Sequence, residues 1–408
     1  MPKSERSGTP ILLAAVAADM MGFGIVLPLL PFYAEEMGAS PFEITLILAS
    51  FSAAQLVAGP LLGRLSDSIG RRPVMVAGLM ASSLSYLLFA LAATVPVLLL
   101  SRVAAGASGS MAVAQAYSAD SSTGNRRAAA MARVGAAAGL GVMIGPAIGG
   151  YASRYGLGAA GYFAAILCAA NALAALLFLP ESPRFRGKSK KSRQPGPPPR
   201  EIFGAVTSFP LSLLFPTYFL SITCFAAMTS ILALFGERRF EMTASDMGIV
   251  FTLAGAVTVI VRGGLVGRVV GRLGETKTLR IGCLMLAGSV LAIPLAPSQS
   301  WIYVIVPCWA LSTAALFPSI QSLMSQFARD HIQGSVMGAG QLAGGSGRVI
   351  GPLAAGLMFQ AHSPELPFFF ASALAAVALL MAFALPPPPA DSEVLPGAGS
   401  QPAGNVNG

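Results

Sequence analysis

Twelve apolar runs, each long enough to cross a lipid bilayer, occupy most of this 408-residue chain. A membrane-spanning helix needs about 20 predominantly apolar residues. The runs cover residues 10–33, 43–66, 73–93, 95–118, 129–152, 160–180, 208–235, 246–267, 279–297, 301–325, 335–359 and 366–386. Only 11% of the residues are charged, far fewer than in soluble domains. The sequence therefore predicts an all-α integral membrane protein with twelve transmembrane helices.

The basic residues are unevenly divided between the two sets of loops that alternate along the chain. With the N-terminus placed in the cytoplasm, nineteen lysines and arginines fall on the cytoplasmic side and three, Arg154, Arg238 and Arg239, on the other. An excess of basic residues marks cytoplasmic loops. We therefore expect a plasma-membrane protein with both termini in the cytoplasm. This placement also accounts for the net charge of +9 without a nucleic-acid partner.

One long polar segment divides the twelve runs into two sets of six. Residues 181–207 contain seven basic residues, from Arg184 to Arg200, beside a proline-rich stretch, which is typical of an extended or disordered linker. We expect an N-terminal half at 1–180, a cytoplasmic linker at 181–207, a C-terminal half at 208–386 and a disordered cytoplasmic tail at 387–408.

The two halves repeat one another. "GRLSDSIGRRPVM" (63–75) follows the second run, and "GRVVGRLGETKTL" (267–279) follows the eighth. "GVMIGPAIGG" (141–150) lies in the fifth run and "GRVIGPLAAG" (347–356) in the eleventh. Repeats at matching positions indicate an internal duplication. Two six-helix halves related about the membrane normal are the layout of the major facilitator transporters, with pseudo-twofold symmetry.

The motifs carry this resemblance further. The segment 63–73 resembles the signature loop of the major facilitator superfamily, G-x-L-x-D-x-x-G-R-R-P, at every fixed position. "DMMGFGIVLPLLP" (19–31) and "GVMIGPAIGG" are similar to motifs of its twelve-helix drug/proton antiporters, and segments 235–255 and 318–338 resemble the tetracycline efflux branch. The resemblance implies a secondary active transporter, most simply a proton-coupled exporter of small hydrophobic or drug-like compounds working by alternating access.

The signature loop predicts a gating latch. In the family this loop fastens helix 2 to helix 11 in the outward-facing state, and a carboxylate that closes helix 4 joins it. A carboxylate among arginines can accept charge-assisted hydrogen bonds. The alternative is that the arginines only mark topology, which leaves Asp67 unexplained. The latch candidates are Gly63, Asp67, Gly70, Arg71, Arg72 and Asp120.

A glycine stripe marks the fifth run. Glycines four residues apart share one helix face and let two helices approach closely in lipid. The antiporter resemblance implies that this packing also seals a leak between helices 5 and 8; the alternative is static packing. The motif residues are Gly141, Gly145, Pro146, Gly149 and Gly150.

Two charged residues lie inside apolar runs where charge is costly. Asp19 in helix 1 can bind and release a proton, or meet a cationic substrate; alternatively it makes a structural hydrogen bond. Arg102 in helix 4 is expected near Asp19, and the resemblance implies that it faces the central cavity and helps move protons; alternatively it is a structural partner of helix 1. The tetracycline branch has further acidic and histidine residues where Ser85, Thr258 and Leu286 stand here, so proton coupling depends on Asp19 and Arg102.

Other candidates concern the substrate. Gln115, Tyr117 and Arg348 are candidate cavity residues. Arg262 lies near the cytoplasmic end of helix 8, where its long side chain can extend its charge to the membrane surface, and it is not a substrate candidate. Only two histidines occur, and no metal-ligand pattern or phosphate-binding loop is found. We expect no cofactor, no metal and no enzymatic activity. The partners are then a small-molecule substrate, protons and the bilayer, with a monomer as the unit. A transporter of a physiological metabolite and a non-transporting sensor remain alternatives.

Overall fold

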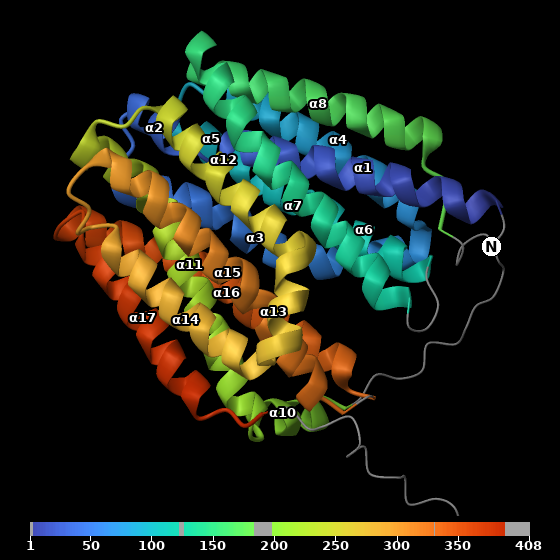
Figure 1. Cartoon of the computed structure of the whole chain (residues 1–408). Helices are drawn as coiled ribbons and strands as arrows, with labels where there is room; N and C mark the ends of the chain where they lie inside the picture. The colour runs from blue at the N-terminus through green and yellow to red at the C-terminus, as the bar shows by residue number, and fades with distance from the viewer. Residues whose placement is uncertain (1–2, 122–125, 183–197, 330, 388–408) are drawn as a thin grey trace, which may run out of the picture.

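The computed structural model describes residues 3–121, 126–182, 198–329 and 331–387, and within them it contains helices and no β-strand. The N-terminal half forms six transmembrane segments from nine helices (Figure 1). These are α1 (Lys3–Val26), α2 (Leu30–Glu36), α3 (Pro41–Ile69), α4 (Arg71–Ala90), α5 (Val95–Ala107), α6 (Ser110–Asp120), α7 (Arg126–Ala152), η1 (Ser153–Tyr155) and α8 (Leu157–Phe178).

The C-terminal half repeats the arrangement. Its helices are α10 (Pro199–Thr207), α11 (Leu211–Phe240), α12 (Ala244–Ile260), the π-helix η2 (Val261–Leu265), α13 (Val266–Leu273), α14 (Glu275–Ala292), α15 (Gln299–Phe327), α16 (Gln333–Ala361) and α17 (Leu366–Phe383). Ten helical stretches of the described chain are long and apolar enough to cross a membrane. The other two expected spans are α14, which begins with charged residues, and the glycine-rich α16. The all-helical fold expected from the sequence is confirmed.

Matching local signals start equivalent helices in the two halves. Ser40 and Glu43 form a capping box at the start of α3, and Thr243 and Asp246 form one at the start of α12. In each box the side chains satisfy backbone N–H groups that the first turn leaves unpaired. Farther along, Gly70 links α3 to α4 with a φ of +109°. These shared devices support the internal duplication.

Three expected runs are not continuous α-helices. The first run breaks between α1 and α2, where Pro28 and Pro31 follow one another closely. The fourth run breaks between α5 and α6, because Gly109 adopts the left-handed conformation with a φ of +60°. The eighth run contains the π-helix η2. The linker also differs from the expectation, because residues Pro199–Thr207 form helix α10; residues 183–197, and the tail from 388, lie outside the described chain.

The two halves are packed together at the end of the bundle that carries α2, here called the α2 end. A Cβ built on Gly150 of α7 would lie 3.1 Å from the Cα of Gly248 of α12. On the other side of the molecule, Gly356 of α16 packs against Thr45 of α3. Arg238 of α11 forms an ion pair of 3.5 Å with Glu35 of α2. One continuous core of buried side chains joins the halves at this end.

The same helix pairs separate toward the opposite end, which carries α10 (Figure 1). The α7 face that touches α12 at Gly150 continues at Gly139, and a Cβ there would meet nothing within 4 Å. In the other helix pair, Leu56 of α3 packs against Gly345 of α16. Seven residues farther along the same α3 face, a Cβ on Gly63 would meet nothing within 4 Å, and the same is true of Gly338 on α16. The halves are therefore closed at the α2 end and open at the α10 end.

Candidate functional site

Asp19 is buried in the middle of the N-terminal half. Its side chain on α1 is 4% exposed. The hydroxyl of Ser110 donates to carboxylate oxygen Oδ2, and Ser82 of α4 lies near the carboxyl group. Oδ1 has no hydrogen-bond partner among the described residues. A buried carboxyl group with an unsatisfied oxygen is able to take up a proton or a ligand donor, because such an oxygen is costly to leave unpaired.

The break in the fourth transmembrane segment positions Ser110. Gly109 turns the chain with its positive φ, so that α6 begins at Ser110 beside Asp19. The preceding residue, Ser108, lies so close to α4 that a Cβ on Gly78 would stand 2.6 Å from the Ser108 carbonyl oxygen. The interruption of the helix is therefore part of how the carboxyl group gains its partner.

Arg102 is also buried, but it does not pair with Asp19. Its side chain is 3% exposed, and within the described chain no ion pair joins the two residues. The guanidinium carbon lies 5.3 Å from the ring centre of Tyr86 and 5.0 Å from that of Phe89. Aromatic faces attract cations, so these rings take the place of the expected carboxylate. One terminal nitrogen of Arg102 has no partner among the described residues.

Tyr86 is the common neighbour of both charges. It is 3% exposed and lies within electrostatic range of both Asp19 and Arg102. It also packs tightly on α1, where a Cβ on Gly22 would stand 2.9 Å from its ring. Asp19 and Arg102 thus belong to one buried polar region linked through a phenol, rather than to a direct ion pair.

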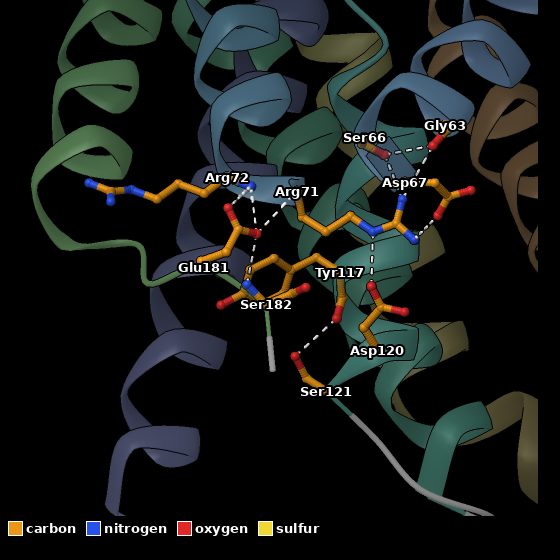
Figure 2. A network of polar contacts seen from close by, with 10 residues as sticks. All are labelled: Gly63, Ser66, Asp67, Arg71, Arg72, Tyr117, Asp120, Ser121, Glu181 and Ser182. Atoms are coloured by element: carbon orange, nitrogen blue, oxygen red, sulfur yellow. Dashed lines mark hydrogen bonds and ion pairs between the residues drawn. The ribbon is translucent and has the colours of Figure 1, made fainter. Parts of the chain in front are cut away.

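The signature loop forms a second polar network at the α10 end (Figure 2). Arg71 is 4% exposed, and its guanidinium makes ion pairs of 2.6 Å with Asp67 and 2.9 Å with Asp120. It also donates to the Ser66 hydroxyl and to the Gly63 carbonyl oxygen. The structure therefore brings together Asp67, Arg71 and Asp120 from three helices of the N-terminal half.

Glu181 belongs to this network, although the sequence reasoning did not single it out. Its carboxylate accepts hydrogen bonds from the backbone N–H groups of Arg71 at 2.8 Å, Arg72 at 3.2 Å and Ser182 at 2.9 Å (Figure 2). A carboxylate at a helix N-terminus satisfies unpaired N–H groups and the helix dipole. A Cβ on Gly70 would lie 2.7 Å from this carboxylate. The signal in the sequence is an acid directly after the sixth run, in "LPESP".

The glycine stripe of α7 packs mainly on α1, within its own half. A Cβ on Gly145 would lie 2.6 Å from the carbonyl oxygen of Met21, and Gly141 and Gly149 similarly face Ala17 and Ile25. Gly150, one residue beyond the stripe, makes the contact with α12, and the carbonyl oxygen of Pro146 lies beside Gly248. The expected contact between helices 5 and 8 is thus made by Gly150 and Pro146 together with Met143, which lies against Gly255 of α12, whereas the stripe itself serves the contact with helix 1.

The remaining candidates occupy different surroundings. The Tyr117 hydroxyl donates to the Pro180 carbonyl oxygen at 2.8 Å, and its side chain lies in the packed core of the N-terminal half, not in a cavity. Gln115 is exposed on α6 and Arg348 is half-buried on α16. Arg262 is exposed within η2. No group of three or more potential metal ligands occurs in the part of the chain that the structure describes.

Comparisons with known proteins place these features in context. The sequence model of the Major Facilitator Superfamily matches residues 12–352. Multidrug resistance protein 2 of Bacillus subtilis is 28% identical over 380 residues, which cover 90% of this chain and 92% of that protein. Tetracycline resistance protein, class E, of Escherichia coli is 30% identical over 365 residues, covering 86% and 87%. The crystal structure of the human organic anion transporter MFSD10 (TETRAN) has a TM-score of 0.70 at 25% identity, covering 94% of this chain and all of that one.

Proposed function

Because the chain belongs to the Major Facilitator Superfamily, whose members are transporters and not enzymes, we propose that it is a proton-driven exporter of small, largely hydrophobic compounds. Relatives named for multidrug and tetracycline resistance support export as the direction. The sequence offers no phosphate-binding loop for ATP, so an ion gradient is the simplest source of energy.

The observation that carries the proton coupling is the buried carboxyl group of Asp19. It is the one Asp or Glu among the buried residues of the described chain, and it retains an oxygen without a partner. Intramembrane carboxyl groups in transporters mark proton and substrate pathways. Arg102 and Tyr86 form a second buried polar pair beside it. Because Tyr86 lies within electrostatic range of both charges, protonation of Asp19 would change the electrostatic interactions of Tyr86 and Arg102.

The different packing of the halves at the two ends of the bundle supports transport by alternating access. In the described state the halves are closed at the α2 end and open at the α10 end, and rocking about the central contacts would reverse this. We propose that the α10 end is cytoplasmic, so that this state receives substrate from the cytoplasm. Gln115 and Arg348 remain proposed substrate contacts, to be tested by the substrate affinity of their alanine variants.

A flux measurement tests the proposed function directly. Purified protein is reconstituted into vesicles with an acidic interior, and uptake of a neutral fluorescent dye is followed. Exchange of protons for dye predicts accumulation that a proton ionophore abolishes. Accumulation that is insensitive to the pH gradient would contradict the proton coupling, and a metabolite taken up in preference to the dye would favour the alternative substrate class.

The proposed orientation predicts the accessibility of the linker. Seven basic residues between Arg184 and Arg200 favour a cytoplasmic position for this segment. A single cysteine introduced by Ser192→Cys in a variant without other reactive cysteines should react with a membrane-impermeant maleimide in inside-out vesicles and not in intact cells. Reaction in intact cells would reverse the orientation.

The latch predicts a transport defect without a folding defect. We propose that Asp67, Arg71 and Asp120 hold α3 to the start of α16 when the α10 end closes. Asp67→Asn should lower efflux severalfold or more while membrane abundance stays near normal, because Arg71 retains Asp120 as its partner. Glu365→Gln, at the α2 end, is the charge-removal control. Wild-type efflux from Asp67→Asn would contradict the latch.

A further inference from the structure

Three hydrogen-bond donors without acceptors lie along one path in the C-terminal half. The indole Nε1 of Trp309 has no partner among the described residues, and its side chain is 4% exposed. The Tyr218 hydroxyl accepts a hydrogen bond of 3.2 Å from Gln321, which leaves the phenolic hydrogen to donate elsewhere. Arg262 has neither an ion pair nor a hydrogen bond within the described chain. The buried Trp309 and Tyr218 require acceptors that these parts of the protein do not supply, and the exposed guanidinium of Arg262 is available to an acceptor from outside.

Aromatic rings join these donors. Trp309 of α15 stacks on Phe225 of α11, with ring centres 5.0 Å apart and planes inclined by 12°. The ring centre of Phe317 lies 5.6 Å from that of Phe225 and 6.2 Å from that of Tyr218, and its ring plane is nearly perpendicular to both. Phe225 is the partly exposed member of the group. The arrangement offers stacked and edge-on surfaces of the kind that bind flat rings.

Arg262 lies at the junction between α12 and α13. It is close enough to Tyr218 for the two to interact electrostatically. Arg262 belongs to the π-helix η2, and a Cβ on its neighbour Gly263 would meet nothing within 4 Å. Single-turn π-helices occur frequently at functional sites. The guanidinium therefore stands exposed near the open end, while the aromatic cluster lies deeper in the bundle.

The spacing suits an elongated ligand. Tyr218 and Phe225 are seven residues apart on α11, which corresponds to about 10 Å along the helix axis. A ligand of two or three fused rings with an acidic group at one end spans this distance. Its acidic oxygens would meet Arg262 and the Tyr218 hydroxyl, and its ring would lie at Phe225.

We infer that this cluster is a substrate site for flat aromatic compounds that carry an anionic group, such as aromatic carboxylates. The inference rests on the proposed transport function, whose substrate class it narrows. Donors and a cation with no carboxylate beside them favour an anion over the organic cations that many exporters accept. Trp309 would act as a second donor, toward a carbonyl or hydroxyl oxygen on the far side of the ring.

Binding of three matched probes to the full-length purified protein tests the inference. The probes are 2-naphthoate, neutral 2-naphthamide and cationic 2-naphthylmethylammonium, and their dissociation constants are measured by isothermal titration calorimetry. The wild type should bind the naphthoate most tightly. Arg262→Gln should lower naphthoate affinity by about tenfold, as expected for a charge-assisted hydrogen bond, and leave naphthamide nearly unchanged.

Two further variants sharpen the result. Arg268→Gln removes an exposed charge from the adjacent helix α13 and should change none of the affinities. Trp309→Phe keeps an aromatic ring but removes the N–H group, and should weaken a hydroxyl-bearing naphthoate, 6-hydroxy-2-naphthoate, more than 2-naphthoate itself.

The outcomes separate this inference from the proposed function. Preference for the cation, equal loss of all three probes in Arg262→Gln, or no binding of any probe would overturn the inference. If dye uptake driven by the pH gradient persists in those cases, the proposed function stands without this substrate class. If the naphthoate binds as expected but no pH gradient drives transport, the substrate site stands and the proton-coupled export fails.

Discussion

Asp19→Asn is expected to reduce efflux driven by a pH gradient to the level of vesicles without protein. The amide has nearly the shape of the carboxyl group and can still accept a hydrogen bond from Ser110, but it cannot bind and release a proton in each cycle. Uptake of a neutral dye into vesicles with an acidic interior measures the effect. Binding of the dye, and exchange between equal dye concentrations without a gradient, should survive.

The internal control is the comparison with and without the gradient on the same preparation. Retention of exchange shows that the variant is folded and can alternate. Driven uptake of a neutral dye at near wild-type rate would assign Asp19 a structural role. Loss of affinity for cationic compounds alone, with neutral compounds still driven, would make Asp19 a substrate contact instead.

Gly145→Val is expected to prevent the N-terminal half from packing. The Cβ would stand 2.6 Å from the carbonyl oxygen of Met21 and 2.7 Å from the Cα of Gly24, which are backbone atoms that no rotamer change can move. Overpacking of a close contact costs about 1–3 kcal/mol and more where backbone must shift. The amount of monodisperse protein in detergent and its melting temperature should both fall sharply.

Gly139→Val is the matched control for this substitution. Gly139 lies on the same helix, and a Cβ there would meet nothing within 4 Å in the described state. This variant should be extracted and should melt like the wild type. Equal stability of the Gly145 and Gly139 variants would show that α1 and α7 do not approach as closely as described.

The sequence predicted the features that depend on short-range spacing. The twelve spans, the duplication and the family follow from apolar length and from fixed motif positions, and the family and transport function are confirmed. The motif also indicated that Asp67, Arg71 and Asp120 act together, and the structure brings them within ion-pair distance. A charged residue inside an apolar run, or an acidic residue in a basic loop, is not explained by membrane topology, and it therefore indicates a functional or structural site even before the fold is known.

Features that depend on helix rotation could not be predicted in the same way. Arg102 was expected beside Asp19, but it points to Tyr86 and Phe89, because rings on α4 offer it an aromatic surface. A glycine stripe shows that some helix approaches closely, without showing that the neighbour is α1 rather than α12. The turn at Gly109 was hidden inside an apolar run, since a single glycine is also tolerated within a helix.

The contact between Gly150 and Gly248 has a mechanical consequence. A Cβ on Gly248 would lie 2.8 Å from the Cα of Gly150, so at this point the two helices cross backbone to backbone, whereas farther along α7 the Met143 side chain packs against Gly255 of α12. Where side chains of one helix pack into the grooves of another, they resist tilting, because they must leave those grooves before the helix can move. A smooth crossing lacks that resistance. It can serve as the point about which one half turns against the other during the transport cycle.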